Sequence, residues 1–134
     1  KEVALDRPDR PSVFHELLEA LGAKPVDFAL ATECCGAYQV LGNPDAAENL
    51  SYGIIKDAVA NGAEAMALAC PLCEYNLGHR QNKVRQTHPD LPDIPVYYFT
   101  QLMAVAFGLP VETNHFELNR SGSLELLKGK AFVA

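Results

Sequence analysis

The chain has 134 residues, of which 49% are hydrophobic and 21% are charged, a balance typical of one compact globular domain rather than of a disordered segment. Its formal charge is −6, and no cluster of Lys and Arg is available to neutralise phosphates, which excludes the common classes of nucleic-acid-binding protein. The sequence contains no run of 18 apolar residues, so we expect no transmembrane helix.

Helical and extended patterns alternate in the first half of the chain. Apolar residues at helical spacing, between a proline and a glycine, predict a helix over residues 12–21. The short apolar run 25–31 predicts a strand that leads into the first two cysteines. An Asn-Pro-Asp sequence predicts that a second helix starts at residue 43, because it supplies a capping side chain, a proline in the first turn and an acid beside it.

The second half of the chain continues the alternation. Residues 65–69 form an unbroken run of small apolar side chains, which favours a parallel strand covered on both faces. This run ends at Cys70, and the proline that follows predicts the start of a helix that carries Cys73. A third strand is predicted over 95–99, followed by helices over 102–107 and 123–128.

This order of elements predicts an α/β fold, a three-layer domain with a mostly parallel sheet that spans residues 1–134 as a single unit. Parallel strands joined by right-handed crossovers place their carboxyl ends on one edge of the sheet. Both cysteine pairs follow the end of an expected strand, so we expect the four thiols to meet at that edge, where ligands bind in open α/β sheets.

The four cysteines are arranged as an adjacent pair, Cys34 and Cys35, and a Cys-x-x-Cys pair, Cys70 and Cys73. In a chain that can form a good core, such an arrangement favours metal or redox chemistry over a disulfide framework. Thiolates are the preferred ligands of iron–sulfur clusters and of structural zinc. Gly36 follows the adjacent pair and allows the backbone to approach a cofactor closely.

Three other interpretations of these cysteines stay open at this point. The Cys-x-x-Cys pair alone is compatible with a thioredoxin-like redox pair, all four thiols could be inert buried residues, and four cysteines can bind one structural zinc ion. Adjacent cysteines chelate a single tetrahedral ion poorly, whereas a cluster with several irons can bind each of them through a different iron. The spacing therefore favours an iron–sulfur cluster, with zinc as the alternative.

The sequence also resembles a known family. The Cys-Cys-Gly segment that starts at Cys34, and the segment 70–77 with Gln81 one turn later, are similar to the CCG cysteine-rich domain. That domain occurs in the B-type subunit of heterodisulfide reductase and in related glycolate, lactate and quinone-linked oxidoreductases. Residues 94–102 resemble the strand and helix that follow in the family, and Asn76 also matches its motif.

The resemblance implies a non-cubane 4Fe-4S cluster in an electron-transfer subunit of a multi-subunit oxidoreductase. Its ligands here would be Cys34, Cys35, Cys70 and Cys73, through which electrons reach a small disulfide, a quinone-linked substrate or another redox centre. The cluster can be lost when such a protein is handled in air. We expect the subunit to be cytoplasmic, with contact to a membrane only through partner subunits.

The sequence departs from the family pattern in one respect. The family motif begins with a further cysteine some 30 to 40 residues before the adjacent pair, whereas residues 1–33 contain none. The expected position falls at about Lys1 or before it. We therefore expect this chain to be a piece of a longer subunit, with the additional ligand upstream of Lys1.

Overall fold

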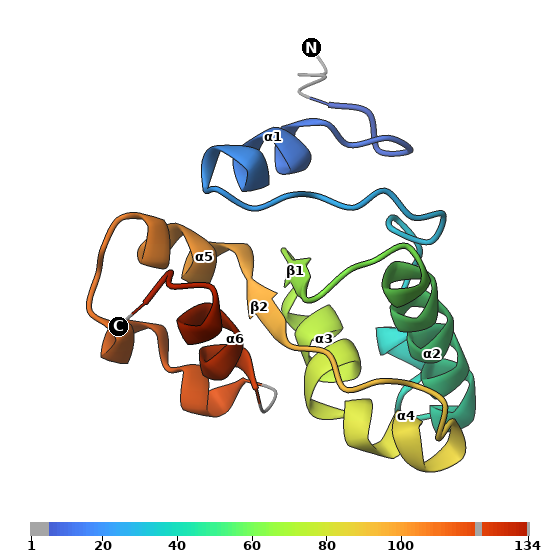
Figure 1. Cartoon of the computed structure of the whole chain (residues 1–134). Helices are drawn as coiled ribbons and strands as arrows, with labels where there is room; N and C mark the ends of the chain where they lie inside the picture. The colour runs from blue at the N-terminus through green and yellow to red at the C-terminus, as the bar shows by residue number, and fades with distance from the viewer. Residues whose placement is uncertain (1–5, 120–121, 134) are drawn as a thin grey trace.

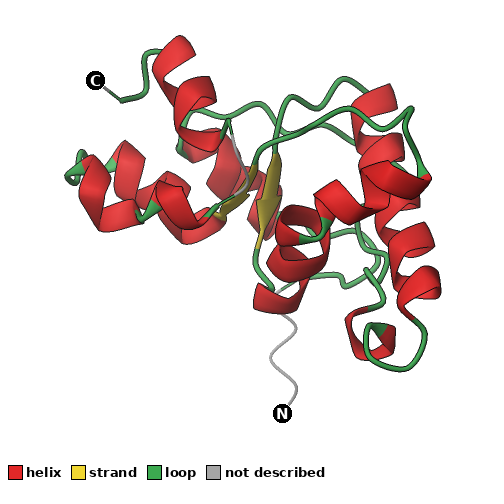
Figure 2. Cartoon of the chain, turned by 90° about the horizontal axis from the view of Figure 1, so that it is seen from below, coloured by secondary structure: helices red, strands yellow, loops and turns green. Residues whose placement is uncertain are grey.

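Two short parallel strands lie at the centre of the molecule, with helices on both sides of them (Figure 1, Figure 2). The computed structural model describes residues 6–119 and 122–133. Strand β1 (Met66–Leu68) pairs with β2 (Val96–Tyr98) in parallel, with Met66 opposite Val96 and Leu68 opposite Tyr98. Helices combined with a parallel sheet, of two strands in the described part of the chain, are compatible with the expected α/β class.

Helices precede, connect and follow the strands. The α-helices are α1 (Val13–Ala20), α2 (Pro44–Ala60), α3 (Pro71–Cys73), α4 (Gln81–Thr87), α5 (Phe99–Ala106) and α6 (Ser123–Gly129). Short turns of 3-10 helix are η1 (Ala37–Gln39), η3 (Val111–Asn114) and η4 (Phe116–Leu118), and η2 (Glu74–His79) is a π-helix. The Asn43 side chain caps α2 by accepting from the backbone N–H of Ala46 at 3.2 Å, as the Asn-Pro-Asp sequence predicts. No helix of the described residues has the length and apolar character that crossing a membrane requires.

The two faces of the sheet bury two different hydrophobic clusters. Val96 packs into the larger cluster with residues of α2, β1, η2 and α4. The next residue, Tyr97, packs against Phe116 and Leu127 in a smaller cluster with α6. Successive side chains of a strand point to opposite faces, so the few residues of β2 join both halves of the molecule.

The prediction of a strand over residues 25–31 is wrong. This segment is a loop with backbone turns, in which the N–H of Ala31 donates to the carbonyl of Phe28. The backbone N–H of Leu30 donates to the Asp57 carboxylate of α2 at 2.9 Å. Phe28 and Leu30 pack against the larger cluster. The apolar character of the segment therefore serves packing against α2 and the sheet, without pairing to a neighbouring strand.

The single helix expected after Cys70 is divided into α3, η2 and α4. The backbone N–H of Arg80 donates to the carbonyl of Tyr75 at 2.9 Å, which is the i to i−5 bond of a π-turn. The side chain of Gln81 donates to the carbonyl of Leu77 at 2.8 Å, so the changed register does not leave this buried carbonyl unpaired. π-Turns of this kind are frequent at functional sites.

Candidate functional site

The first cysteine pair lies in a loop that approaches α2 closely. Gly36 has a φ of 75°, in the left-handed region that glycine adopts without strain. A Cβ atom at this position would lie 2.8 Å from Leu50 Cδ1 and 3.1 Å from Ala47 Cα. Both the backbone conformation and the close approach to Ala47 therefore favour glycine here, and the preceding Cys35 is 1% exposed.

The second pair lies on the turn that follows β1. Cys70 comes two residues after the end of the strand and is exposed, and Cys73 is partly buried. The backbone N–H of Cys73 donates to the Cys70 carbonyl at 3.1 Å, which closes the turn. Cys70 therefore lies two residues beyond β1, whereas Cys34 and Cys35 follow a loop.

The structure brings the two pairs together. The Sγ atoms of Cys35 and Cys73 are 3.4 Å apart, although 38 residues separate them in the sequence. Cys70 precedes the short helix α3, which ends at Cys73, so these two cysteines belong to one turn. Cys34 is exposed, and its sulfur accepts from the backbone N–H of Gly36 at 3.4 Å. In the described ranges, no three His, Cys, Asp or Glu side chains are arranged to hold a single metal ion.

The two cysteines of the Cys-x-x-Cys pair differ in acidity. The backbone N–H of Cys73 donates to the Cys70 sulfur and lowers the pKa of the Cys70 thiol. Burial raises the pKa of the Cys73 thiol, and its hydrogen bond with Cys35 raises this pKa further. Cys70 is therefore the exposed, more acidic thiol, and Cys73 joins it to the buried Cys35.

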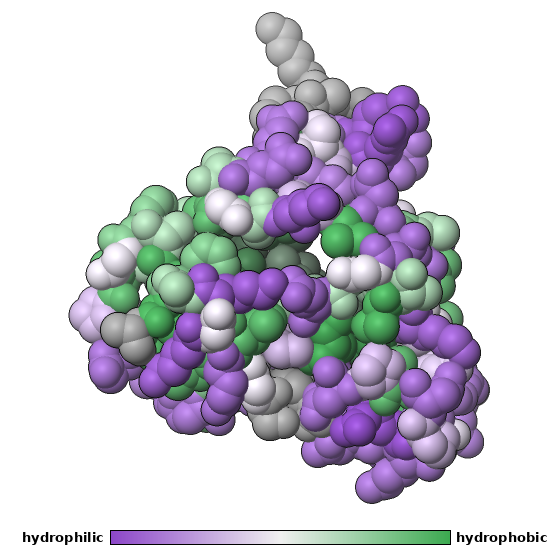
Figure 3. Space-filling model, in the orientation of Figure 1, coloured by the Kyte–Doolittle hydropathy of each residue, from purple (hydrophilic) through white to green (hydrophobic). Residues whose placement is uncertain are grey.

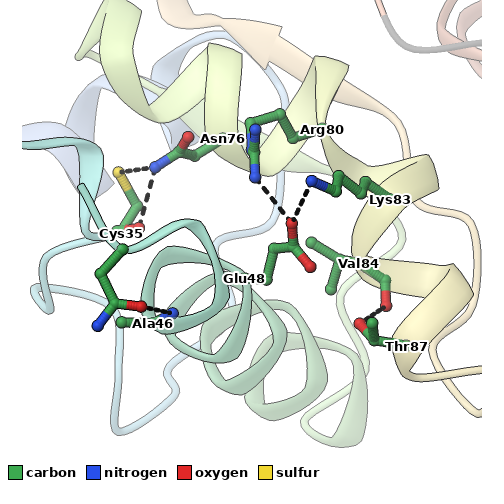
Figure 4. Close-up of polar contacts among 9 residues, drawn as sticks. Cys35, Ala46, Glu48, Asn76, Arg80, Lys83, Val84 and Thr87 are labelled. Carbon is green, nitrogen blue, oxygen red and sulfur yellow. Dashed lines mark hydrogen bonds and ion pairs between the residues drawn. The ribbon is translucent and has the colours of Figure 1, made fainter. Parts of the chain in front are cut away.

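Asn76 and Gln81 both project from the segment that follows the second pair, and both are buried. Asn76 Nδ2 donates to the Cys35 carbonyl at 3.0 Å and lies 3.6 Å from Cys35 Sγ (Figure 4). The Gln81 amide bonds the backbone N–H and carbonyl of Ile94, just before β2, at 2.9 and 3.1 Å. Asn76 therefore belongs to the cysteine site, whereas Gln81 fixes the backbone of the segment that leads into β2.

The helical segment after Cys73 is held against α2 by a buried ion pair. The Glu48 carboxylate of α2 accepts from Arg80 at 2.8 Å and lies 3.3 Å from the Lys83 ammonium (Figure 4). The Glu48 side chain is 4% exposed. This contact fixes the position of η2, and with it Asn76, relative to the helix on which Gly36 rests.

Sequence reasoning missed two groups next to the thiols, Glu74 and Tyr98. Burial raises the pKa of the Glu74 carboxyl, and the nearby His79 at 3.4 Å acts against this shift. Burial also raises the pKa of Tyr98, and the charges of Glu74, Cys70 and Cys73 add to it. Tyr98 could have been found from the sequence, because it ends the strand beside the one that leads to Cys70. Glu74, His79 and Tyr98 line a small hollow of about 270 Å³.

A second and larger hollow of about 970 Å³ lies under the N-terminal segment, residues 11–28. Its wall includes Cys73, Leu77 and residues of β1, and residues 22–28 cover it. Figure 3 shows this hollow beneath the N-terminal part of the chain, with hydrophobic side chains around it. The cysteine site is thus bordered by the larger hollow at Cys73 and by the smaller one at Glu74.

The donor set is suited to a sulfur-rich, negatively charged group. The thiols of Cys35 and Cys73 are in contact, and Cys34 and Cys70 are near them in the sequence, one on the same loop and one on the same turn. N–H groups of Asn76 and Gly36 point at the cysteine sulfurs. Donors of this kind stabilise thiolates and the sulfides of iron–sulfur clusters.

Comparison with known proteins relates the chain to subunits of redox enzymes. The B-type subunit of the ferredoxin/F(420)H(2)-dependent CoB-CoM heterodisulfide reductase of Methanosarcina acetivorans is 32% identical over 132 residues, which cover 95% of this chain and 43% of that subunit. The membrane anchor subunit of the 8-methylmenaquinol:fumarate reductase of Wolinella succinogenes is 29% identical over 112 residues, which cover 84% of this chain and 39% of that subunit. The chain thus spans less than half the length of these relatives.

The match to a family model covers the whole cysteine site. The model of the CCG cysteine-rich domain matches residues 3–78, more than half of the chain. This range contains both cysteine pairs, the Gly36 turn and Asn76. The resemblance seen in the sequence is therefore confirmed, and the chain belongs to the CCG cysteine-rich domain family.

Proposed function

We propose that this chain is an iron–sulfur domain of a heterodisulfide-reductase-like oxidoreductase, with Cys34, Cys35, Cys70 and Cys73 as ligands of a non-cubane 4Fe-4S cluster. The observation that supports the proposal most is the 3.4 Å contact between the sulfurs of Cys35 and Cys73. A loop and a turn from distant parts of the sequence contribute thiols to one place, which is what a shared cofactor requires.

The bound cluster would supply one-electron transfer to a disulfide or to another redox partner. The protein's own residues hold it and control its surroundings. Gly36 brings the Cys-Cys loop against α2, and the backbone N–H of Cys73 stabilises the Cys70 thiolate. Burial of Cys35 keeps water from one side of the site, which strengthens electrostatic interactions there.

The proposal extends to the surroundings in which the domain acts. The relatives are named as subunits of reductases, one of them a membrane anchor subunit. We infer that this domain works with further redox subunits on the cytoplasmic side, and that its oxidant is a small disulfide or a quinone-linked substrate. The alternative is a domain of the same kind of complex in which zinc takes a structural role.

Metal analysis of single-cysteine variants tests the proposal. Protein reconstituted under anaerobic conditions should contain iron and acid-labile sulfide, and Cys35→Ser or Cys70→Ser should abolish their retention. Helix content, measured by circular dichroism, should be nearly unchanged, because the hydrophobic clusters on both faces of the sheet do not need the cofactor. Full iron retention in these variants would contradict the ligand assignment, and one zinc ion per chain without sulfide would favour the structural alternative.

A further inference from the structure

The amide of Asn76 is only half satisfied. Its Nδ2 donates to the carbonyl of Cys35 at 3.0 Å and reaches Cys35 Sγ at 3.6 Å, as Figure 4 shows. Its Oδ1 is buried and has no hydrogen-bond partner in the described part of the chain. The residue is 1% exposed, so bulk solvent does not reach this oxygen.

An unpaired buried oxygen is costly, and a leucine of similar size would avoid that cost. The neighbouring Gln81 provides the contrast, because its oxygen and its nitrogen both have backbone partners. These backbone hydrogen bonds explain why Gln81 is buried, without any role in the cysteine site. The orientation of Asn76 is explained by what its NH2 group contacts, which is Cys35.

We propose that Asn76 is the positioning residue for Cys35: it holds the Cys35 sulfur toward Cys73 and donates to it, which raises the reduction potential of the site. The second half of this statement rests on the proposed function, and the first half does not. The carbonyl contact fixes the backbone of Cys35, and the sulfur contact places an N–H dipole beside the ligand.

The direction of the effect on the potential follows from charge. Reduction adds a negative charge to a cluster, and part of this charge resides on its thiolate ligands. A hydrogen-bond donor at a ligand sulfur stabilises the reduced state more than the oxidised one. Loss of the donor therefore lowers the reduction potential.

The test uses three variants of the full chain. Asn76→Leu removes the amide at nearly constant volume, and Asn76→Asp keeps the shape but replaces the donor with an acceptor. Asn82→Leu is the matched control, because Asn82 lies in α4 and is exposed. Redox titration of reconstituted protein, followed by absorbance or electron paramagnetic resonance, measures the potential, which a purely structural role of Asn76 would not change.

We expect Asn76→Leu to lower the equilibrium constant for one-electron reduction about tenfold, equivalent to about 59 mV. Asn76→Asp should lower it at least as far, because a carboxylate disfavours additional negative charge, and Asn82→Leu should leave it unchanged. If Asn76→Leu does not fold, the reduction potential of Asn76→Asp decides the test. A potential equal to that of the parent chain in both Asn76 variants would overturn the proposal for the loaded site.

A second measurement needs no cofactor. Metal-free protein is treated with oxidised glutathione, and peptide mapping follows the bond between Cys35 and Cys73. In this reaction the two protein thiols are oxidised to one disulfide, and their two electrons and two protons pass to one glutathione disulfide, which becomes two glutathione thiols. Because the sulfurs are held 3.4 Å apart, the parent chain and Asn82→Leu should form this bond readily. Asn76→Leu should form it about tenfold more slowly.

The two measurements separate the positioning role from the proposed function. If the parent chain binds no iron but bond formation depends on Asn76, the iron–sulfur proposal fails and the positioning role stands. If iron binds and neither the potential nor the rate depends on Asn76, the positioning role fails and the iron–sulfur proposal stands.

Discussion

Two cysteines three positions apart occupy different environments in this site. Cys70 is exposed and accepts from a backbone N–H, whereas Cys73 is partly buried and contacts a second thiol. The first environment stabilises a thiolate and the second disfavours it. The Cys-x-x-Cys pair is therefore chemically asymmetric before any cofactor binds.

This asymmetry predicts the order of alkylation in metal-free protein. The thiolate is the nucleophile, and the lowered pKa of Cys70 gives it a larger thiolate fraction than an ordinary thiol at neutral pH. The raised pKa of Cys73 keeps it protonated. Iodoacetamide should label Cys70 before Cys73, and as the pH is raised the rate at Cys70 should level off at a lower pH than the rate at Cys73. Peptide mapping measures both rates.

The control for this experiment is the same reaction in denaturant. Unfolding removes both the backbone donor and the burial, so the two cysteines should then react at similar rates. Equal rates in the folded protein would contradict the asymmetry. A faster reaction at Cys73 than at Cys70 would contradict the positions of both thiols.

Gly36 offers a second prediction at the scale of one residue. Gly36→Ala should destabilise the metal-free protein by about 2–4 kcal/mol, because left-handed backbone strain adds to overpacking against α2. Gly62→Ala is the matched control: Gly62 has a φ of 94°, but nothing lies within 4 Å of its Cβ position. It should cost only the strain, about 1–2 kcal/mol. Urea denaturation gives both values, and equal losses would mean that the Cys-Cys loop does not press against α2.

At the scale of elements, the sequence predicts the helices whose first residues are marked by a local signal, such as a capping residue or a proline. The capping residues of α2 and the proline after Cys70 mark helix starts at the observed positions. The strand expected over 25–31 fails because Phe28 and Leu30 are buried by packing, and strand pairing requires a partner that local composition does not reveal. The π-helix after Cys73 was not predicted either. The Gln81 side chain that accompanies it donates to the carbonyls of Leu77 and Ile94, and local sequence does not reveal such contacts.

The cysteine site was predictable in part for the same reason. The four cysteines and Gly36 stand out by type and spacing, and Cys70 lies on the turn after β1. The contacts of Asn76 with Cys35 join elements that are 41 residues apart in the sequence. No local pattern specifies which buried amide faces a thiol, so this role became visible only in three dimensions.

The link between α2 and the segment after Cys73 predicts unequal effects of two neighbouring cations. Arg80→Met leaves the buried Glu48 carboxylate with one exposed partner and should cost about 2–4 kcal/mol, because a buried charge without its main partner is strongly unfavourable. Lys83→Met removes a partner whose side chain is 54% exposed and should cost at most about 1 kcal/mol. Denaturant unfolding compares them, and equal costs would contradict the assigned burial of the pair.

At the scale of the whole molecule, the sheet separates two hydrophobic clusters, and the cysteine site lies with the larger one. Cys35 is a member of that cluster and Cys73 packs against it. The N-terminal segment covers an apolar hollow that reaches Cys73. Loss of the cofactor should therefore leave the fold in place, whereas changes in the core beneath Cys35 should alter the site.

The central claim, that the Cys-Cys loop and the Cys-x-x-Cys turn bind one iron–sulfur cluster, is tested most directly by X-ray absorption at the iron edge of anaerobically reconstituted protein. We expect a first shell of sulfur around iron together with scattering from neighbouring irons, both absent in Cys35→Ser. A first shell of nitrogen and oxygen without neighbouring iron, or the same spectrum in Cys35→Ser, would contradict it.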